Sequence, residues 1–386
     1  MDEALVERMR EFGETIFAEM TQRALAADAV NLGQGFPDTD GPAAVLDAAV
    51  EAIRSGRNQY PPAIGVPELR AAIAGHQLRF RGTTVDADTE VLVTAGATEA
   101  IAASILALCE SGDEVVVFEP YYDSYAASIA LAGAVRRTSV LRFPDFAVDE
   151  TSLRAAFSPR TKLVLLNTPH NPTGRVFTRA ELELIASLAI EHDAYVVADE
   201  VYEHLVYDGE HLPIASLPDM AERTLSISSG GKTFATTGWK VGWVTGPAAL
   251  VSAVRTVKQF LTFVSSGPFQ PAIATGLRLP DSFFAGLRDD MQARRDLLAD
   301  GLADLGLPVS VPQGGYFVVA DAAAWGPDGL AVCRALPEQA GVAAVPVSAF
   351  LDDKTSGATL VRFAFCKRPE VIKEGVARLH KAFSTA

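Results

Sequence analysis

The chain has 386 residues, 49% of them hydrophobic and 21% charged, a composition that excludes an intrinsically disordered chain and allows two domains with a core each. Its formal net charge of −15 argues against nucleic acid and anionic membrane surfaces as partners, because both would repel the protein. Any phosphate that the protein binds must therefore be held by local groups.

The N-terminal part of the chain combines helical segments with a loop rich in glycine and proline. Gly33 and Gly35 in that loop allow a close backbone approach to a ligand or simply a tight turn. Tyr60 precedes two prolines, and by itself such a tyrosine is expected to pack against its own loop. Helices are predicted from Leu5 to Ala27, from Ala43 to Ile53 and from Pro67 to Arg81.

Strands and helices alternate through the middle of the chain. Such alternation predicts a mostly parallel sheet with helices on both faces, and ligands of such sheets bind beyond the carboxyl ends of the strands. Strands are predicted at residues 90–96, 114–120, 134–141, 161–167 and 194–202, with helices at 98–110, 121–133 and 178–193.

Two of these strand ends carry candidate binding groups. Gly96, Ala97 and Thr98 form a turn that opens a helix, and the free N–H groups of a first helical turn attract anions, although many such turns bind nothing. Tyr122 follows the next strand, where its ring could stack on a cofactor or simply pack in the core.

Polar residues also follow two later strands. Asp199 could keep a pyridine nitrogen protonated, so that the ring draws off carbanion charge, or it could cap the next turn. Asn171 and Tyr202 could hydrogen-bond a phenolate oxygen, although each alone is more often a turn or core residue.

Lys232 lies among serine, glycine and threonine between two β-prone runs, LSIS and WKVGWV. A partly desolvated amine has a lowered pKa and can condense with a carbonyl as a Schiff base. Ser229 and Lys240 are able to hold a phosphate nearby. An aldehyde with a phosphate fits both features, which points to pyridoxal 5′-phosphate; a buried turn with a neutralised lysine is the alternative.

The C-terminal part is first more helical and then alternates again. Pro280 marks a plausible exit from the first domain, and long helices are predicted from Ser282 to Leu305 and from Pro369 to Phe383. Arg362 lies inside an apolar strand, either on a solvated face or aimed at a carboxylate, and the pattern leaves both possibilities open.

The cysteines and the chain start bear on the compartment. Cys109, Cys333 and Cys366 share no metal-like spacing, so we predict no metal site and expect all three to be buried in a reducing compartment. The start of the chain is charged, and no apolar run approaches the roughly 18 residues of a membrane span. We therefore predict a cytoplasmic protein without a membrane partner.

Several motifs then occur together, in the order and near the spacing of one family. They are NLGQGFPD, NQYPP, VTAGATEA, GDEVVVFEPYYDSY, NTPHNPTG, ADEVYEHL, SSGGKTF with TGWKVGW, and VRFAFCK. Over nearly its whole length the chain resembles the fold-type I pyridoxal-phosphate aminotransferases of class I, and most closely the branch of kynurenine aminotransferases, glutamine transaminase K and bacterial methionine aminotransferases. The resemblance implies an α/β fold, with a large domain at residues 43–280 whose mostly parallel sheet lies between helices, and a smaller α/β domain built from residues 1–42 and 281–386.

The resemblance also implies roles for the matching residues. Lys232 matches the Schiff-base lysine that shuttles the substrate proton, and Asp199 matches the partner of the pyridine nitrogen. Asn171 and Tyr202 match the groups on the phenolic oxygen, and Tyr122 matches the ring stacked on the cofactor. Positions around the phosphate are matched by Ala97, Thr98, Ser229 and Lys240.

Two further matches concern the substrate and a partner subunit. Arg362, with Gly35 beside it, matches the arginine that grips the substrate α-carboxylate. Tyr60 resembles the tyrosine that reaches the phosphate from the neighbouring subunit. The resemblance therefore implies a homodimer whose active sites are shared between subunits.

One departure bears on the substrate. Kynurenine-type enzymes tend to place aromatic or histidine side chains where this chain has Val264, Ser265, Ser266 and Gly267, which argues against an aromatic substrate. The SGPFQPA segment resembles the actinobacterial N-succinyldiaminopimelate aminotransferases, which act in lysine biosynthesis on a long, acylated substrate.

The implied activity is a ping-pong transfer of an amino group from an L-amino acid to a 2-oxo acid such as 2-oxoglutarate. The first alternative is N-succinyldiaminopimelate as the specific substrate. The second is a β-lyase acting on cysteine conjugates, because the same carbanion can expel a β-leaving group. A regulatory protein that binds pyridoxal phosphate is the third.

Overall fold

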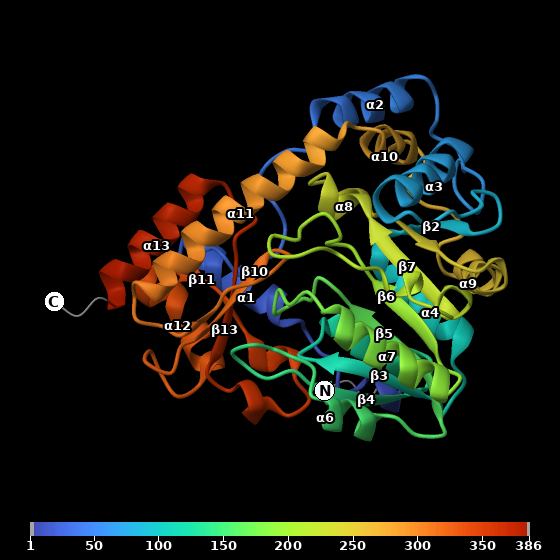
Figure 1. Cartoon of the computed structure of the whole chain (residues 1–386). Helices are drawn as coiled ribbons and strands as arrows, with labels where there is room; N and C mark the ends of the chain where they lie inside the picture. Colours follow the sequence, from blue (N-terminus) through green and yellow to red (C-terminus); the bar gives the residue numbers. More distant parts are fainter. Residues whose placement is uncertain (1–3, 384–386) are drawn as a thin grey trace.

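The computed structural model describes residues 4–383 and is built around a seven-stranded sheet (Figure 1). The strands lie in the order β2-β8-β7-β6-β5-β3-β4, and only β8 runs antiparallel to its neighbours. The predicted, mostly parallel α/β sheet is therefore confirmed. Its strands are β2 (Val91–Ala95), β3 (Glu114–Glu119), β4 (Val135–Val140), β5 (Thr161–Asn167), β6 (Tyr195–Asp199), β7 (Thr224–Ser229) and β8 (Val241–Thr245).

Helices cover both faces of the sheet, so the central strands β3, β5, β6 and β7 are buried over nearly their whole length. On β5, Val164 and Leu166 pack toward α6 (Glu150–Ala156) and α7 (Arg179–Glu191). The intervening Leu163 and Leu165 pack in a second core with α4 (Gly96–Leu108), α5 (Asp123–Leu131) and α9 (Ala248–Leu261). Alternate side chains of one strand thus supply two cores, which fixes the sheet between its helical layers.

Three more helices pack together at the β2 edge of the sheet (Figure 1). They are α2 (Ala43–Arg54), α3 (Pro67–Arg81) and α10 (Phe269–Leu277), and their buried faces share a core with β2 and β8. No helix was predicted at α10, whose first turn lies in the proline-containing GPFQPA segment.

Two smaller sheets lie beside the large one. The antiparallel strands of the four-stranded sheet come from the C-terminal part of the chain and lie in the order β12-β13-β10-β9. A two-stranded parallel sheet pairs β1 (Val30–Asn31) with β11 (Val342–Ala343) and so combines the two ends of the chain. The smaller body that holds these two sheets includes α1 (Ile16–Ala26), α11 (Asp281–Ala303), α12 (Gly329–Ala340), α13 (Pro369–Phe383), β9 (Val309–Ser310), β10 (Phe317–Asp321), β12 (Val345–Pro346) and β13 (Leu360–Ala364).

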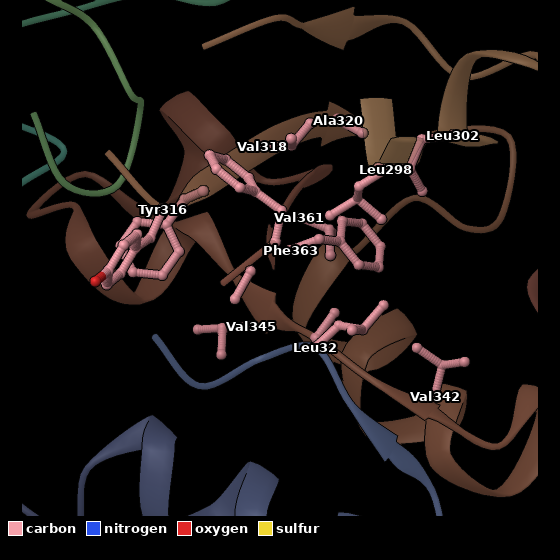
Figure 2. Packing of buried hydrophobic residues seen from close by; sticks show 14 of the residues in the cluster. Leu32, Leu298, Leu302, Tyr316, Val318, Ala320, Val342, Val345, Val361 and Phe363 are labelled. Atoms are coloured by element: carbon pink, nitrogen blue, oxygen red, sulfur yellow. The ribbon is translucent and has the colours of Figure 1, made fainter. Parts of the chain in front are cut away.

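The core of the smaller body is apolar and continuous (Figure 2). Leu32, from the N-terminal segment, lies in the same cluster as Leu298 of α11 and Phe363 of β13. The two chain ends therefore contribute to one core, while the division into a large domain at residues 43–280 and a smaller domain from both chain ends stays a prediction.

The helix predicted from Leu5 to Ala27 is wrong at its start. The structure has a short 3-10 turn at Glu7–Met9, and α1 begins only at Ile16. Gly13 interrupts the segment, and the Thr15 side chain accepts a hydrogen bond from the Ala18 N–H, which caps the helix there. The helices at residues 67–81 and 369–383 have the predicted bounds.

Two further expectations concern the cysteines and the membrane. Cys109, Cys333 and Cys366 are all buried, as predicted, and none of them forms a disulfide bond. Between residues 4 and 383, no helix combines the length and the apolar character that a membrane crossing requires.

Candidate active site

A cavity of about 330 Å³ lies where the larger sheet meets the smaller one. The carboxyl ends of β2, β5, β6 and β7 open into it, and β10 and β13 contribute side chains from the opposite side. All the predicted site residues except Tyr60 line this cavity, namely Gly35, Ala97, Thr98, Tyr122, Asn171, Asp199, Tyr202, Ser229, Lys232, Lys240 and Arg362.

Lys232 is presented by α8 (Gly230–Thr233), a short helix that follows β7. Ser229 caps this helix, since its side-chain oxygen accepts from the Gly231 N–H at 3.2 Å. Lys232 Nζ donates to the Gly35 carbonyl at 3.3 Å and makes no ion pair with any carboxylate of residues 4–383. Burial lowers the pKa of the Lys232 amine, so the amine is poised to act as a nucleophile.

Asp199 ends β6 and faces the same cavity. Its Oδ2 accepts a hydrogen bond from the Tyr125 hydroxyl at 2.6 Å, and the Asn167 side chain donates to its backbone carbonyl at 2.9 Å. Burial raises the pKa of Asp199 to about 6, while the hydrogen bond from Tyr125 opposes that rise. Asp199 is therefore a fixed carboxylate that is ionised at neutral pH.

One end of the cavity is built to hold an anion. Gly96 opens α4 with a φ of +75°, so the first amide groups of this helix, at Ala97 and Thr98, lie at the cavity wall. A Cβ on Gly96 would lie only 3.2 Å from Lys240 Nζ, so glycine leaves room for the ammonium beside the helix start. Ser229 lines the same cavity.

Arg362 lies on β13 and is 1% exposed, which excludes the solvated face that the sequence left open. Its guanidinium donates to Asn171 Oδ1 at 3.0 Å and to the Gly33 carbonyl at 2.8 Å. Arg362 Nε is buried without a partner among residues 4–383. Burial lowers the pKa of Arg362 to about 10, and the side chain therefore keeps a positive charge with donor capacity left for an anion.

The two cavity tyrosines that the sequence identified differ in exposure. Tyr202 is buried, and burial raises its pKa well above the ordinary value, so its hydroxyl is a neutral donor. Lys232 Nζ lies 5.6 Å from the centre of the Tyr202 ring. Tyr122 is half-buried, with burial raising its pKa to about 12, and its ring forms part of the cavity wall.

Tyr60 lies outside this cavity and is 81% exposed. Its ring lies 5.5 Å from that of Phe263, beside a surface hollow formed by residues 58–61 and 264–268. Tyr60 therefore does not complete the cavity of its own chain.

Several cavity residues were not found from the sequence. Tyr125 and Asn167 hold Asp199, and Phe317 lies against Arg362, with its ring centre 3.9 Å from the guanidinium carbon. Tyr125 could have been noticed, since it follows Tyr122 by one helical turn. The other missed lining residues are Phe17, Gln34, Phe36, Ile101, Val201, Gly231 and Thr237.

The donor set fits a phosphorylated aldehyde that carries a pyridine ring. An amine without a carboxylate partner lies in one cavity with a buried carboxylate, and the glycine-opened helix start beside Lys240 suits a phosphate. The guanidinium of Arg362, with its unpartnered Nε, remains for a second anion.

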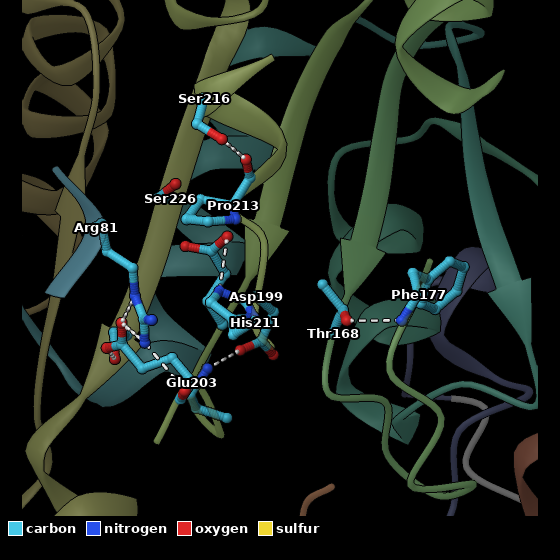
Figure 3. Close-up of polar contacts among 12 residues, drawn as sticks. Arg81, Thr168, Phe177, Asp199, Glu203, His211, Pro213, Ser216 and Ser226 are labelled. Carbon is cyan, nitrogen blue, oxygen red and sulfur yellow. Dashed lines mark hydrogen bonds and ion pairs between the residues drawn. The ribbon is translucent and has the colours of Figure 1, made fainter. Parts of the chain in front are cut away.

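A cluster that could hold a metal ion lies elsewhere, at His76, Glu203 and His204. Its groups already bind one another or neighbours. The Nε2 atoms of His76 and His204 are 2.7 Å apart, and Glu203 accepts from the Ser228 hydroxyl. Glu203 also accepts from Arg81 (Figure 3). We assign the cluster a structural role.

Comparison with known proteins agrees with this geometry. The family described as "Aminotransferase class I and II" matches residues 27–379. The probable N-succinyldiaminopimelate aminotransferase of Mycobacterium tuberculosis H37Rv is 50% identical, over 97% of each chain, and the methionine aminotransferase of Escherichia coli K12 is 39% identical over 97% of each. The solved N-succinyldiaminopimelate aminotransferase of M. tuberculosis superposes with a TM-score of 0.96, covering 98% of this chain and 100% of the other at 50% identity.

Proposed function

The chain belongs to the class I and II aminotransferase family and is a transaminase, and we propose that it uses pyridoxal 5′-phosphate to move an amino group from an L-amino acid to a 2-oxo acid such as 2-oxoglutarate. One observation carries this proposal. The partly buried Lys232 shares a cavity with the buried carboxylate of Asp199 and with the Arg362 guanidinium, whose Nε has no partner among residues 4–383. A nucleophile, an electrostatic anchor and a carboxylate receptor thus converge on one site.

When bound, pyridoxal phosphate supplies an aldehyde that condenses with amines and a ring that draws off the charge left by a departing α-proton. The chain's own residues would hold it. Asp199 would keep a proton on the ring nitrogen, and Asn171 and Tyr202 would donate to the phenolic oxygen. Tyr122 would lie against the ring. Ala97, Thr98, Ser229 and Lys240 would hold the phosphate.

Substrate binding and proton transfer fall to two further residues. Arg362 binds the α-carboxylate and so orients the α-C–H bond within the cavity. Lys232, with its lowered pKa, would take the α-proton of the substrate as a base and hold it on Nζ. The Gly35 carbonyl, which accepts from Lys232 Nζ at 3.3 Å, orients the amine for this task.

N-succinyldiaminopimelate is the amino donor for which the most specific support exists. A relative that bears this substrate in its name is 50% identical over 97% of each chain. In addition, the small residues at 264–267 line the surface hollow beside Tyr60 and leave space for a long side chain. Methionine is the competing donor, since the E. coli methionine aminotransferase is 39% identical.

Steady-state kinetics with 2-oxoglutarate as acceptor separate these donors. We expect kcat/KM for N-succinyldiaminopimelate to exceed the values for methionine, glutamine and kynurenine by at least about tenfold. A higher kcat/KM for methionine would show that methionine is the preferred amino donor, and the proposed transamination would still stand. No turnover with any donor would contradict the proposed function.

We propose further that the active unit is a homodimer. Tyr60, at 81% exposed, and Phe260, at 84% exposed, present large apolar surfaces that a second copy of the chain would cover. Tyr60 would then reach the phosphate bound in the partner subunit. The three free, buried cysteines are compatible with a reducing cytoplasm, which we propose as the compartment.

A further inference from the structure

Arg362 is enclosed by aromatic rings from three separate elements. The guanidinium carbon lies 3.9 Å from the ring centre of Phe317, 5.0 Å from that of Phe350 and 5.2 Å from that of Phe17. These residues belong to β10, to the 3-10 turn Val347–Phe350 and to α1. Among residues 4–383, no carboxylate forms an ion pair with Arg362, so its charge faces the oxygens of Asn171 and Gly33, to which it donates, and the faces of these rings.

The sheet register places the closest ring beside the guanidinium. Arg362 on β13 is directly opposite Val319 on β10, and Phe317 precedes Val319 by two residues. Phe317 and Arg362 are therefore diagonal neighbours on one face of the antiparallel pair, within reach of an aromatic side chain. The intervening Phe363 points to the other face, into the core of the smaller body (Figure 2).

Gly35 holds the Phe317 ring in this place from the other side. A Cβ on Gly35 would lie 2.3 Å from Phe317 Cζ, a separation that no side chain tolerates. The ring thus lies between the Gly35 backbone and the guanidinium, and both Gly35 and Phe317 line the cavity. Glycine at position 35 is required so that the ring can stay in contact with Arg362.

We propose that Phe317 is a positioning residue for substrate binding, which holds the guanidinium of Arg362 in a fixed plane and orientation so that it receives the α-carboxylate. The inference rests on the proposed function, because it assigns the α-carboxylate to Arg362. The hydrogen bonds to Asn171 Oδ1 and the Gly33 carbonyl hold two nitrogens of the guanidinium, and the Phe317 ring, at 3.9 Å, limits the tilt of its plane. A fixed plane presents the remaining N–H donors in the fork that a carboxylate accepts.

The test uses the holoenzyme with bound pyridoxal phosphate, and isothermal titration calorimetry with 2-oxoglutarate, which cannot react with that form. In Phe317→Leu we expect the dissociation constant to rise by about tenfold. Gly35→Ala displaces the ring without removing it and is expected to weaken binding in the same direction. Phe363→Leu is the matched control, since it removes a buried ring from β13 on the opposite face, and we expect a change below about twofold.

Kinetics separate a positioning role from a general loss of structure. We expect Phe317→Leu to raise KM for the amino donor by about tenfold with kcat at saturation within about twofold, and to leave the affinity for pyridoxal phosphate unchanged. Equal binding of 2-oxoglutarate by wild type, Phe317→Leu and Gly35→Ala would overturn the inference, as would an equal loss in Phe363→Leu. A wild-type holoenzyme that turns over no donor would instead overturn the proposed function.

Discussion

The hydroxyl of Tyr125 donates a hydrogen bond of 2.6 Å to Asp199 Oδ2, and both side chains are buried. Burial alone would favour the protonated form of the carboxyl group, whereas a donor on its oxygen favours the ionised form. Tyr125 therefore helps to keep the charge that the ring nitrogen of pyridoxal phosphate requires.

Removal of this hydroxyl should weaken cofactor binding. In Tyr125→Phe the pKa of Asp199 rises, because burial is then opposed by one donor fewer. A hydrogen bond to a charged group contributes about 2 kcal/mol, so we expect the dissociation constant of pyridoxal phosphate at pH 7 to rise by at least about tenfold. Titration of the apoenzyme, followed by absorbance, measures this constant.

Tyr121→Phe is the matched control. Its hydroxyl also bonds a carboxylate, that of Asp352, but Tyr121 does not line the cavity. An equal loss of cofactor affinity in both variants would show that the effect is not specific to Asp199.

Cofactor binding should also depend on pH through Asp199. Burial raises the pKa of this group in the apoenzyme to about 6, and the positive ring nitrogen favours the ionised form in the complex. Binding therefore releases a proton below pH 6 and none well above it. We expect the affinity for pyridoxal phosphate to fall by up to about tenfold per pH unit as the pH drops below about 6.

Other groups also change charge over this pH range, and the variant Asp199→Asn separates their effect on cofactor affinity from that of Asp199. The ammonium of Lys232 and the cofactor phosphate also change charge, and Glu200, Tyr122 and Tyr202 lie around the Asp199 carboxylate. In Asp199→Asn we expect the affinity for pyridoxal phosphate to be low at every pH. We also expect it to fall less steeply below pH 6 than in the wild-type protein, because the Asp199 carboxyl group no longer titrates. Identical pH profiles for the two proteins would contradict this assignment.

A buried ion pair ties α3 to the segment that carries Tyr202. Arg81 donates to Glu203 Oε2 from two nitrogens, at 3.0 and 3.1 Å, and the Glu203 side chain is 2% exposed (Figure 3). In Arg81→Ala this carboxylate stays buried without its cation, so we expect the free energy of unfolding to fall by about 3 kcal/mol or more. Urea denaturation measures the change.

Arg154→Ala provides the comparison for that experiment. Its ion pair with Glu150 is exposed on α6, and we expect a loss below about 1 kcal/mol. Equal free energies of unfolding for Arg81→Ala and Arg154→Ala would contradict the prediction that the buried ion pair stabilises the protein more than the exposed one.

Shared active sites predict that two defective variants complement each other. In a hybrid of Lys232→Ala and Tyr60→Ala, one site combines an intact Lys232 with the partner's intact tyrosine. Random pairing should then restore about a quarter of wild-type activity at limiting cofactor. Coexpression with separate affinity tags and a kinetic assay measures this recovery.

A second pair of variants tests whether activity returns on coexpression for a reason other than shared active sites. Lys232 and Asp199 lie in the cavity of a single chain, so Lys232→Ala and Asp199→Ala leave no intact site in any hybrid. We expect no recovery from this pair, and recovery there would contradict the assignment of both residues to one chain.

The residues that the sequence identified are those whose surroundings are local. Asp199 ends a strand and Lys232 follows one, and a parallel sheet brings such ends together whatever the details of its packing. The Gly96 turn was found for the same reason, whereas Lys240 was found because it follows Lys232 closely in the sequence. The sheet and its helices follow from periodicity that extends over whole elements.

The residues that the sequence missed depend on contacts between distant segments. Phe317 meets Gly35 and Arg362 only after both chain ends have folded into the smaller body. The face of Arg362 was left open because β13 is buried on both sides and shows no alternation. The helix predicted from Leu5 begins only at Ile16, because Gly13 interrupts it and the Thr15 side chain caps α1.

The central claim is that Lys232 condenses with pyridoxal phosphate and that the complex accepts amino groups. Its most direct test is the visible absorption spectrum of the purified protein with pyridoxal phosphate, recorded before and after addition of N-succinyldiaminopimelate or methionine. We expect a visible band that the amino donor removes and 2-oxoglutarate restores, and that Lys232→Ala, although folded, does not show this cycle. No visible band in the wild-type protein, or an unchanged cycle in Lys232→Ala, would contradict the account.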